Sequence, residues 1–164
     1  MSDFPALIHQ ITPWVMNRRC TVEDLEIYEA FNQEYSPSDW TGNPAANAEL
    51  STFAQDGAGG QYALWLGAAG IEGAPVVKLG RDGELVVLAR DLLDFAWLLA
   101  CGVEPIGVGD NGTVRGTVTA SEEMQQWVHS LAPGRAFGTV RETFDAATTA
   151  FPELVARVRA FTAR

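Results

Sequence analysis

Four short apolar segments between residues 50 and 89 constrain the fold of this chain more than any other feature. They are separated by turns rich in glycine and aspartate, among them Asp56-Gly57 and Asp82-Gly83. An Asp-Gly pair between apolar runs is a strong hairpin signal. A parallel crossover needs a dozen or more residues, which none of these turns provides. The pattern predicts an antiparallel meander with strands at 50–54, 61–66, 75–79 and 85–89.

Helical periodicity follows the predicted sheet. Asp91 and Ser121 are typical N-cap residues, and each precedes a run of apolar residues at helical spacing. A last helix closes the chain, and Pro152 should bend or restart it. The sequence therefore predicts a sheet core at 49–89 and helices at 91–101, 121–131 and 143–163. The predicted fold class is α+β, a single domain with a central, largely antiparallel meander sheet packed by helices.

The first 48 residues are predicted to be a helical N-terminal part. Asp3 as N-cap and Pro5 in the first turn precede apolar residues at helical spacing, and Pro13 should kink or end this helix. Residues 36–48 combine prolines, asparagines and a glycine, which indicates a loop. We expect the indole of Trp40 in this loop to fold back on the core, because soluble proteins rarely expose large apolar groups in patches.

A second N-terminal helix is predicted over residues 21–35, with Thr21 as its cap. Its core-facing stripe would consist of Leu25, Tyr28, Phe31 and Tyr35. Glu23, Glu26 and Glu29 lie mostly off that stripe. The predicted helix would therefore bury its aromatic side and expose its acids.

The length of 164 residues suits one domain, and an apolar fraction of 47% fills its core without metal or disulfide staples. The first residues carry an acid and a proline where a signal peptide would need basic residues and an apolar run. No stretch reaches the roughly 18 to 20 apolar residues that cross a bilayer. We therefore expect a cytoplasmic protein.

The net charge of −10 is unevenly distributed. Residues 20–77 contain no Lys or Arg but nine acids: Glu23, Asp24, Glu26, Glu29, Glu34, Asp39, Glu49, Asp56 and Glu72. Such a negative field repels nucleic acid and anionic membranes, and it accelerates encounter with a basic partner. A simpler explanation is solubility, because many cytoplasmic proteins are acidic.

The glycine-rich stretch Gly57–Gly60 resembles a phosphate-binding loop only in composition. Such a loop needs a Lys directly after its last glycine and a helix behind it. Here a strand-like segment follows, and the first Lys is Lys78. We interpret Asp56, Gly57, Gly59 and Gly60 as a structural hairpin loop, in which Asp56 bonds to local backbone amides.

Other sequence motifs for catalysis, cofactor binding or metal binding are weak or absent. Residues 107–112 match G-x-G-x-x-G, but a β-branched segment follows them where a dinucleotide site needs a helix. His9 and His129 have no ligand at a recognised metal spacing. No G-x-S-x-G motif is present. The sequence therefore predicts a non-catalytic protein, without a metal ion or a cofactor.

Several short motifs in the order seen here are similar to those of a known family. They are Phe53, Asp56-Gly57, Gly59-Gly60, Ala63-Leu64-Trp65, Pro75-Val76-Val77, Leu79-Gly80, Gly83-Glu84, Val87, Ala89, Leu92-Leu93-Asp94-Phe95, Trp97-Leu98-Leu99-Ala100 and Gly102. This stretch resembles the SUKH superfamily, named for fungal cell-wall regulators of the Smi and Knr type. The closing Phe151–Leu154 looks like the C-terminal helix of bacterial members. The family's N-terminal glycine-rich motif has no counterpart before residue 49.

The resemblance implies an α+β domain and a function in protein binding. Bacterial members of the family commonly serve as immunity proteins, which neutralise secreted polymorphic toxins, often nucleases, by direct contact. Fungal members are regulatory scaffolds. The leading hypothesis is thus a bacterial immunity protein that captures a basic toxin. We expect its contacts to come from Glu23, Glu26, Glu29, Trp40 and Asp56.

Two alternatives stay open. The first is a stand-alone regulatory or scaffold protein of the same family without a toxin partner, which could also be a homo-oligomer. The second is a small enzyme or ligand-binding protein that uses the Gly57–Gly60 loop. This last hypothesis predicts a deep pocket beside the loop with a perturbed acid or histidine.

Overall fold

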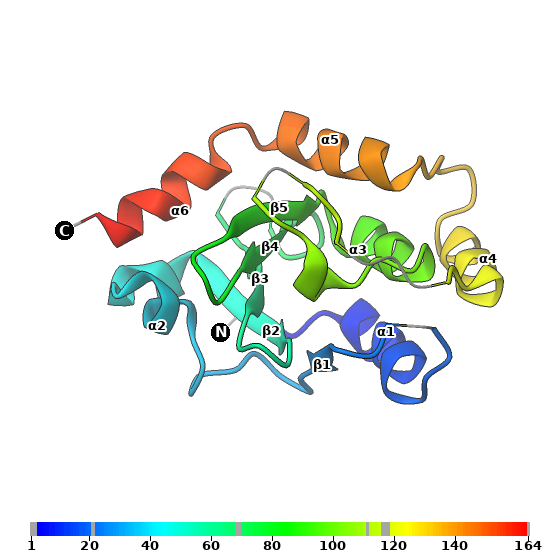
Figure 1. Ribbon diagram of the computed structural model, residues 1–164, viewed down its shortest axis with the longest axis horizontal. Helices are drawn as coiled ribbons and strands as arrows, with labels where there is room; N and C mark the ends of the chain where they lie inside the picture. Colours follow the sequence, from blue (N-terminus) through cyan, green and yellow to red (C-terminus); the bar gives the residue numbers. More distant parts are fainter. Residues whose placement is uncertain (1–2, 21, 68–69, 111, 116–118, 164) are drawn as a thin grey trace.

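A five-stranded antiparallel sheet runs through the centre of the molecule (Figure 1). The computed structural model describes residues 3–20, 22–67, 70–110, 112–115 and 119–163. Each strand pairs with the next one in sequence, and the predicted meander and fold class are confirmed. The strands are β1 (Glu26–Ile27), β2 (Leu50–Gln55), β3 (Gln61–Trp65), β4 (Val76–Leu79) and β5 (Leu85–Ala89). Only β1 was not predicted.

The predicted helices of the second half are present. Asp91 caps α3 by accepting the N–H of Asp94 at 2.9 Å, and Ser121 caps α4 by accepting the N–H of Met124 at 3.2 Å. The chain restarts at Pro152, which lies between the last two helices. The helical elements are α1 (Ala6–Met16), α2 (Pro37–Thr41), η1 (Pro44–Ala48), α3 (Leu92–Ala100), η2 (Pro105–Gly107), α4 (Glu122–Leu131), α5 (Val140–Ala150) and α6 (Leu154–Thr162).

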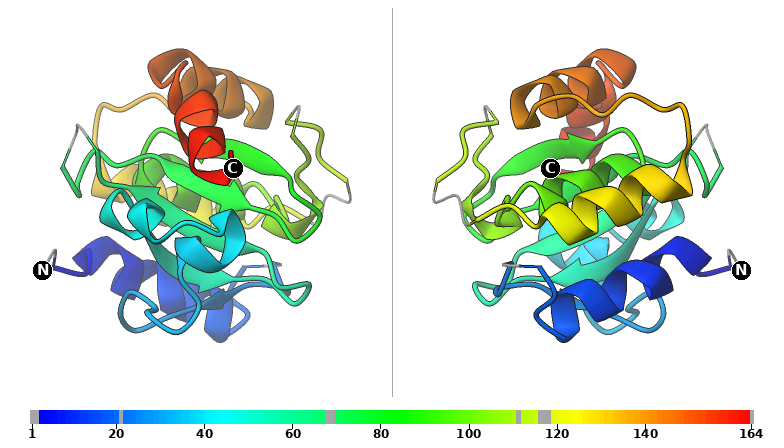
Figure 2. Two further views of the ribbon diagram at one scale, coloured as in Figure 1. Left: turned by 90° about the vertical axis from the view of Figure 1, so that its left-hand side faces the viewer. Right: turned by 90° about the vertical axis from the view of Figure 1, so that its right-hand side faces the viewer.

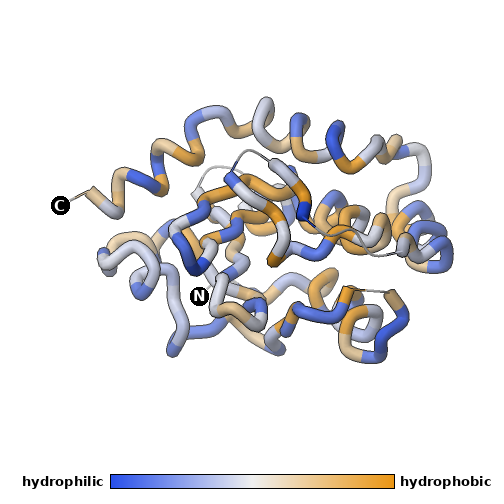
Figure 3. The backbone as a smooth tube through the Cα atoms, viewed as in Figure 1, coloured by the Kyte–Doolittle hydropathy of each residue, from blue (hydrophilic) through white to orange (hydrophobic). Residues whose placement is uncertain are grey.

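The sheet is buried on both faces. One face packs on α1, α3 and α4 through a large core that includes Tyr62, Phe95 and Met124. The other face packs on α6 through a smaller core that includes Leu50 and Val158. Figure 2 shows the helices around the sheet from two sides, and Figure 3 shows apolar residues concentrated along β5 and α3.

The prediction of a helix over 21–35 is wrong, so the N-terminal part is less helical than expected. The predicted cap Thr21 lies outside the described residues. The segment extends along β2 instead, where Tyr28 donates its N–H to Phe53 O and Asn32 donates its N–H to Thr52 O, both at 2.9 Å. These hydrogen bonds satisfy the backbone as a helix would, and they fix the segment to the sheet.

The first helix also differs from the prediction. It begins at Ala6, with Pro5 and not Asp3 in the N-cap position, and it continues past Pro13 to Met16. Trp14 and Val15 are both buried. Their packing holds the last turn although proline removes one helical hydrogen bond. Among the described residues, no helix is both long and apolar enough to span a membrane.

Candidate protein-binding surface

The nine carboxylates of residues 20–77 fall into two groups. In the first group, each carboxylate binds a donor of the chain itself. Asp24 Oδ1 accepts the N–H of Gly57 at 2.9 Å, and Asp39 Oδ2 accepts that of Ser36 at 2.7 Å. This group consists of Asp24, Asp39, Glu49 and Asp56. Four of the nine carboxylates are therefore engaged by the chain itself, and among these four Glu49 is the one paired with a cation.

Glu49 connects the start of β2 to the last helix. It forms an ion pair with Arg157 of α6, and its Oε2 also accepts the indole N–H of Trp65 at 3.2 Å. The hydrogen bond from the Arg157 guanidinium lowers the pKa of Glu49 below its ordinary value. The charge of Glu49 thus serves internal packing.

In the second group, the side chains are exposed to solvent. Glu26 accepts one hydrogen bond, from the neutral amide Nε2 of Gln55 at 2.7 Å, which leaves its charge uncompensated. Within the described ranges, none of this group forms an ion pair. The members are Glu23, Glu26, Glu29, Glu34 and Glu72. The first four lie in residues 23–35, which we call the acidic segment.

Hydrogen bonds to the rest of the chain hold the acidic segment in place. At its start, Glu23 donates its N–H to Glu104 Oε1 at 3.0 Å. Near its end, the side-chain oxygen of Asn32 accepts the N–H groups of Glu34 and Tyr35 at 2.9 and 3.1 Å. Together with the backbone bonds to β2, these contacts present the exposed acids on an ordered support.

An exposed aromatic residue and a surface hollow lie at the end of the acidic segment. Tyr35 is 49% exposed, so its predicted place on a buried helical stripe is wrong. The hollow beside it has a volume of about 440 Å³. Its walls are formed by Phe31, Asn32, Gln33, Ser36, Pro37, Asn47, Ala48, Leu50, Ser51 and Leu66. Glu34 and Tyr35 were not among the contact residues expected from the sequence. For Tyr35 the reason is that the predicted helix placed its side chain in the core.

Two of the residues expected to contact a partner instead take part in internal packing and hydrogen bonding. Trp40 is half-buried against the smaller core, and its indole donates to Gly80 O at 2.7 Å. Asp56 is 5% exposed. Glu23, Glu26 and Glu29 are thus exposed on the acidic segment, whereas Trp40 and Asp56 have packing roles.

The glycine-rich loop after β2 binds the chain's own carboxylates. Asp56 Oδ1 accepts the N–H groups of Ala58 and Gly60 at 3.0 and 2.9 Å, as predicted for a structural hairpin loop. Gly57 donates to Asp24, and Gly59 donates to Asp56 O at 3.0 Å. Gly59 has a φ of +92°, which favours glycine. Every N–H of this loop is thus engaged, and no donor points toward a phosphate.

Two buried polar side chains next to this loop also have structural partners. Tyr62 donates its hydroxyl to Asp56 Oδ2 at 2.6 Å, and its burial raises the pKa of that hydroxyl. Lys78 donates to Ile106 O and Val108 O at 2.9 and 2.7 Å, and its burial lowers the pKa of the amine. Both side chains are at most 2% exposed. Both side chains hold loops to the sheet.

The histidines and acids show no arrangement for a metal ion in the part of the chain that the structure describes. His9 packs against Phe4 with ring centroids 5.0 Å apart, and His129 lies against Trp97 and Phe137 at 5.1 and 5.3 Å. Both imidazoles therefore take part in aromatic packing.

Comparisons with known proteins do not add to this description. No family model, curated protein or solved structure matches the chain. The resemblance to the SUKH superfamily therefore stays a prediction. Functional inference rests on the geometry of the acidic segment.

Proposed function

We propose that this protein is a binding module whose acidic segment captures a basic protein partner. The observation that carries the proposal is the separation of its acids into two groups. Four exposed carboxylates of the acidic segment have no cationic partner in the described ranges, while most other acids of residues 20–77 bind donors within the fold. Uncompensated like charges on one ordered segment repel each other, and a basic partner relieves that repulsion.

The electrostatic role of this segment would be to speed association and select the partner. Charges at the rim of an interface act mainly on the association rate and on its salt dependence. No Lys or Arg occurs from residue 20 to residue 77. No cationic residue close in sequence therefore offsets the negative electrostatic field of the segment.

The affinity would come from Tyr35 and the hollow beside it. Tyrosine is enriched at interfaces because it combines a large apolar ring with a polar hydroxyl. A hollow of about 440 Å³ is large enough to receive a partner side chain. Its half-buried wall residue Phe31 offers apolar contact to the stem of an arginine or lysine.

The biological setting that fits this surface is neutralisation of a toxin by an immunity protein. This part of the proposal rests on the resemblance to bacterial SUKH proteins. A nuclease must bind phosphates and so carries basic groups around its active site. Such a toxin would present the complementary charge to the acidic segment.

The test uses the protein encoded by the neighbouring gene as the binding partner. Association is measured at low and high salt for the wild-type protein and for the variant Glu23→Gln, Glu26→Gln, Glu29→Gln, Glu34→Gln. A matched control neutralises four exposed acids elsewhere, by Glu72→Gln, Asp82→Asn, Glu122→Gln and Glu153→Gln. We expect the acidic-segment variant to associate about tenfold more slowly at low salt, with a flatter salt dependence.

The control variant should bind almost as fast as the wild-type protein. Equal slowing in both variants would show that only net charge matters and would contradict a local binding surface. Tyr35→Ala should raise the dissociation rate and leave the association rate nearly unchanged. No binding to the neighbouring product would favour the regulatory or scaffold function instead.

A further inference from the structure

Two buried polar atoms distinguish the acidic segment from the rest of the molecule. Across the described ranges, buried side-chain nitrogen and oxygen atoms have hydrogen-bond partners, with two exceptions: the hydroxyl of Tyr28 and the Oε2 atom of Glu104. Tyr28 belongs to the acidic segment, and Glu104 holds the start of this segment through the N–H of Glu23. Each buried polar group without a partner needs a physical explanation, because such groups are rare in folded proteins. Both exceptions fall on the surface that we propose for a partner.

The carboxylate of Glu104 is attached to a fixed loop but is only half satisfied. Its Oε1 accepts the N–H of Glu23 at 3.0 Å, whereas its Oε2 is buried without a partner in the described part of the chain. Lys78 fixes the loop that follows by donating to Ile106 O and Val108 O. Glu104 forms no ion pair with a described residue. Its charge is therefore uncompensated, and burial makes such a charge more costly than one on the surface.

The hydroxyl of Tyr28 is a hydrogen-bond donor without an acceptor. Burial raises the pKa of this hydroxyl, and the charge of Glu26 also raises it, so the group keeps its proton at neutral pH. Asn32 lies near enough to oppose this pKa shift, but it makes no hydrogen bond with the hydroxyl. The backbone of Tyr28 is fixed, since its N–H donates to Phe53 O at 2.9 Å. Tyr28 thus holds a free donor on an ordered segment.

Buried polar side chains elsewhere show what a purely structural position looks like. Tyr62 donates its hydroxyl to Asp56 Oδ2 at 2.6 Å, and Thr52 donates to Gln61 Oε1 at 2.8 Å. Tyr28 carries the same chemical group as Tyr62 but lacks such a partner among the described residues. A phenylalanine would fill the same space without the cost of an unpaired hydroxyl. A structural role alone therefore does not account for the hydroxyl of Tyr28.

We propose that Tyr28 and Glu104 determine which basic partner the acidic segment accepts, through hydrogen bonds that form only in the complex. An arginine of the partner would donate to the free oxygen of Glu104. Arginine suits this position because its guanidinium carries several donors and is more weakly hydrated than the ammonium of lysine. A backbone carbonyl oxygen of the partner would accept the hydroxyl proton of Tyr28. This inference rests on the proposed function and deepens it, because it names the groups that a basic partner must present.

Both atoms can reach a partner through small side-chain movements. Tyr28 and Glu104 are half-buried residues, although the two polar atoms themselves are buried. Rotation about side-chain bonds can therefore turn each polar group toward the surface while the backbone stays in place. Rotamer changes of this kind are common at interfaces whose backbone moves little. Hydrogen bonds to a charged group are stronger than those between neutral groups, so Glu104 should contribute more to affinity than Tyr28.

The first test measures the urea midpoint of the free protein and needs no partner. Tyr28→Phe removes a hydroxyl without a partner, so the midpoint should stay the same or rise. Tyr62→Phe is the matched control, because it removes a buried hydroxyl that donates to Asp56, and its midpoint should fall. Glu104→Gln keeps an acceptor for the N–H of Glu23 and removes a buried charge, so its midpoint should also rise.

The second test uses an acetylated and amidated tripeptide, Gly-Arg-Gly, followed by NMR at the N–H of Glu23 and the ring of Tyr28. The same tripeptide with citrulline, which has the shape of arginine without its charge, is the ligand control. We expect the arginine peptide to bind in the millimolar range and more tightly than the citrulline peptide. Glu104→Gln should weaken this binding by about tenfold, and Tyr28→Phe by about threefold. Glu29→Gln, which removes one exposed charge from the same segment, should weaken it by less than about twofold.

Three results would overturn the inference. One is a urea midpoint of Tyr28→Phe that falls as far as that of Tyr62→Phe, because the hydroxyl of Tyr28 would then have a partner inside the molecule. Another is equal binding, or none, of the arginine and citrulline peptides. The last is a Glu104→Gln variant that binds no worse than Glu29→Gln, which would assign the effect to charge alone. The proposed function can stand in each case, since it depends on slower association of the four-glutamine variant of the acidic segment with the neighbouring gene product.

Discussion

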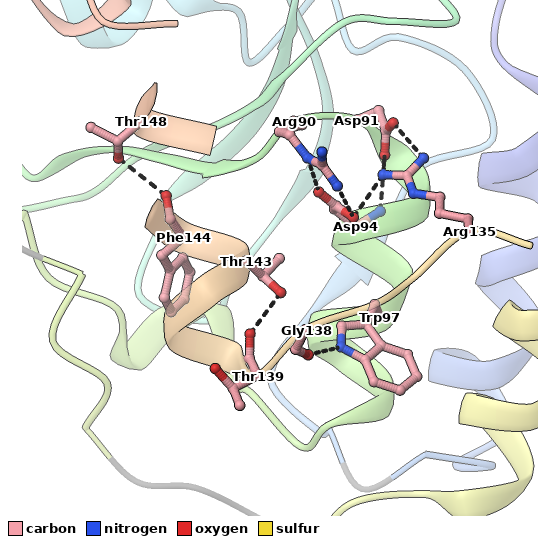
Figure 4. Close-up of polar contacts among 10 residues, drawn as sticks. All are labelled: Arg90, Asp91, Asp94, Trp97, Arg135, Gly138, Thr139, Thr143, Phe144 and Thr148. Carbon is pink, nitrogen blue, oxygen red and sulfur yellow. Dashed lines mark hydrogen bonds and ion pairs between the residues drawn. The ribbon is translucent and has the colours of Figure 1, made fainter. Parts of the chain in front are cut away.

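Acids at the start of α3 and acids on the acidic segment have opposite roles. At α3, Arg135 binds Asp91 at 2.8 and 3.1 Å and Asp94 at 2.7 Å, and Arg90 also binds Asp94 at 2.7 Å (Figure 4). On the acidic segment, four exposed glutamates have no such partner in the described part of the chain. The same chemical group is a structural support in one region and free charge in the other.

The network at α3 joins segments that are distant in sequence. Arg135 lies in the connection between α4 and α5, and Trp97 of α3 donates its indole N–H to Gly138 O of the same connection at 2.8 Å (Figure 4). Asp94 is only 3% exposed in its side chain. A buried carboxylate with several donors is stabilised in place, whereas an exposed carboxylate without one contributes little to folding.

The comparison is tested most severely by Asp94→Ala. This change removes a carboxylate whose side chain is 3% exposed, and it leaves Arg135 with fewer partners and Arg90 without its ion pair. We expect a loss of about 3–5 kcal/mol in the free energy of unfolding, measured with urea. Asp145→Ala, which breaks the exposed pair with Arg141, should cost less than about 0.5 kcal/mol. Similar losses in the two variants would contradict the expected difference between a buried and an exposed carboxylate.

The next largest effect is expected for Asp56→Ala in the glycine-rich loop. The change removes the acceptor of two loop amides and leaves the buried hydroxyl of Tyr62 without a partner. We expect a loss of about 2–3 kcal/mol in the free energy of unfolding. Tyr62→Phe removes the hydroxyl but keeps both amide bonds, so it should cost clearly less. If Tyr62→Phe cost as much as Asp56→Ala, the loop amides would not depend on this carboxylate.

Glu49→Gln should have a smaller effect that depends on pH. The Arg157 hydrogen bond lowers the pKa of Glu49 from 4.5, so the ionised side chain favours the folded state. This contribution is complete above the unfolded pKa and is lost as the pH falls through the folded pKa. In urea unfolding, wild type and variant should differ at pH 7 and converge near pH 3. A difference that persists in acid would show that Glu49 acts through packing and not through its charge.

The smallest effect on stability is expected for the four-glutamine variant of the acidic segment. Its free energy of unfolding should stay within about 0.5 kcal/mol of the wild-type value, and it should rise slightly at low salt as repulsion disappears. The same variant is expected to bind the partner more slowly. A large loss of stability would instead show that these acids contribute to folding, as the acids at α3 do.

Much of the sheet could be predicted because its signals are local. Asp-Gly turns and short connections fix the order and direction of β2 to β5, and the caps Asp91 and Ser121 mark where α3 and α4 begin. The role of the Gly57–Gly60 loop was also predictable from its context. These features depend on residues within one or two turns of each other.

The candidate site was predicted only in part. The absence of Lys and Arg from residues 20–77 pointed to Glu23, Glu26 and Glu29. It did not show that Asp56 is buried or that Trp40 donates to Gly80 O, 40 residues away. Nor did spacing reveal that Arg135 reaches Asp91 and Asp94 across more than 40 residues. Such pairs are set by distances in space.

The sequence by itself determined the antiparallel meander, the helices that follow it and the location of the excess negative charge. The conformation of residues 22–35, in contrast, depends on contacts that only the folded molecule makes. Their apolar spacing suits a helix, yet Tyr28 and Asn32 donate their N–H groups to β2. Backbone bonds to a strand 20 or more residues away compete with helical ones, and packing against the sheet favours the extended form. That outcome is what leaves Tyr35 and the four glutamates exposed.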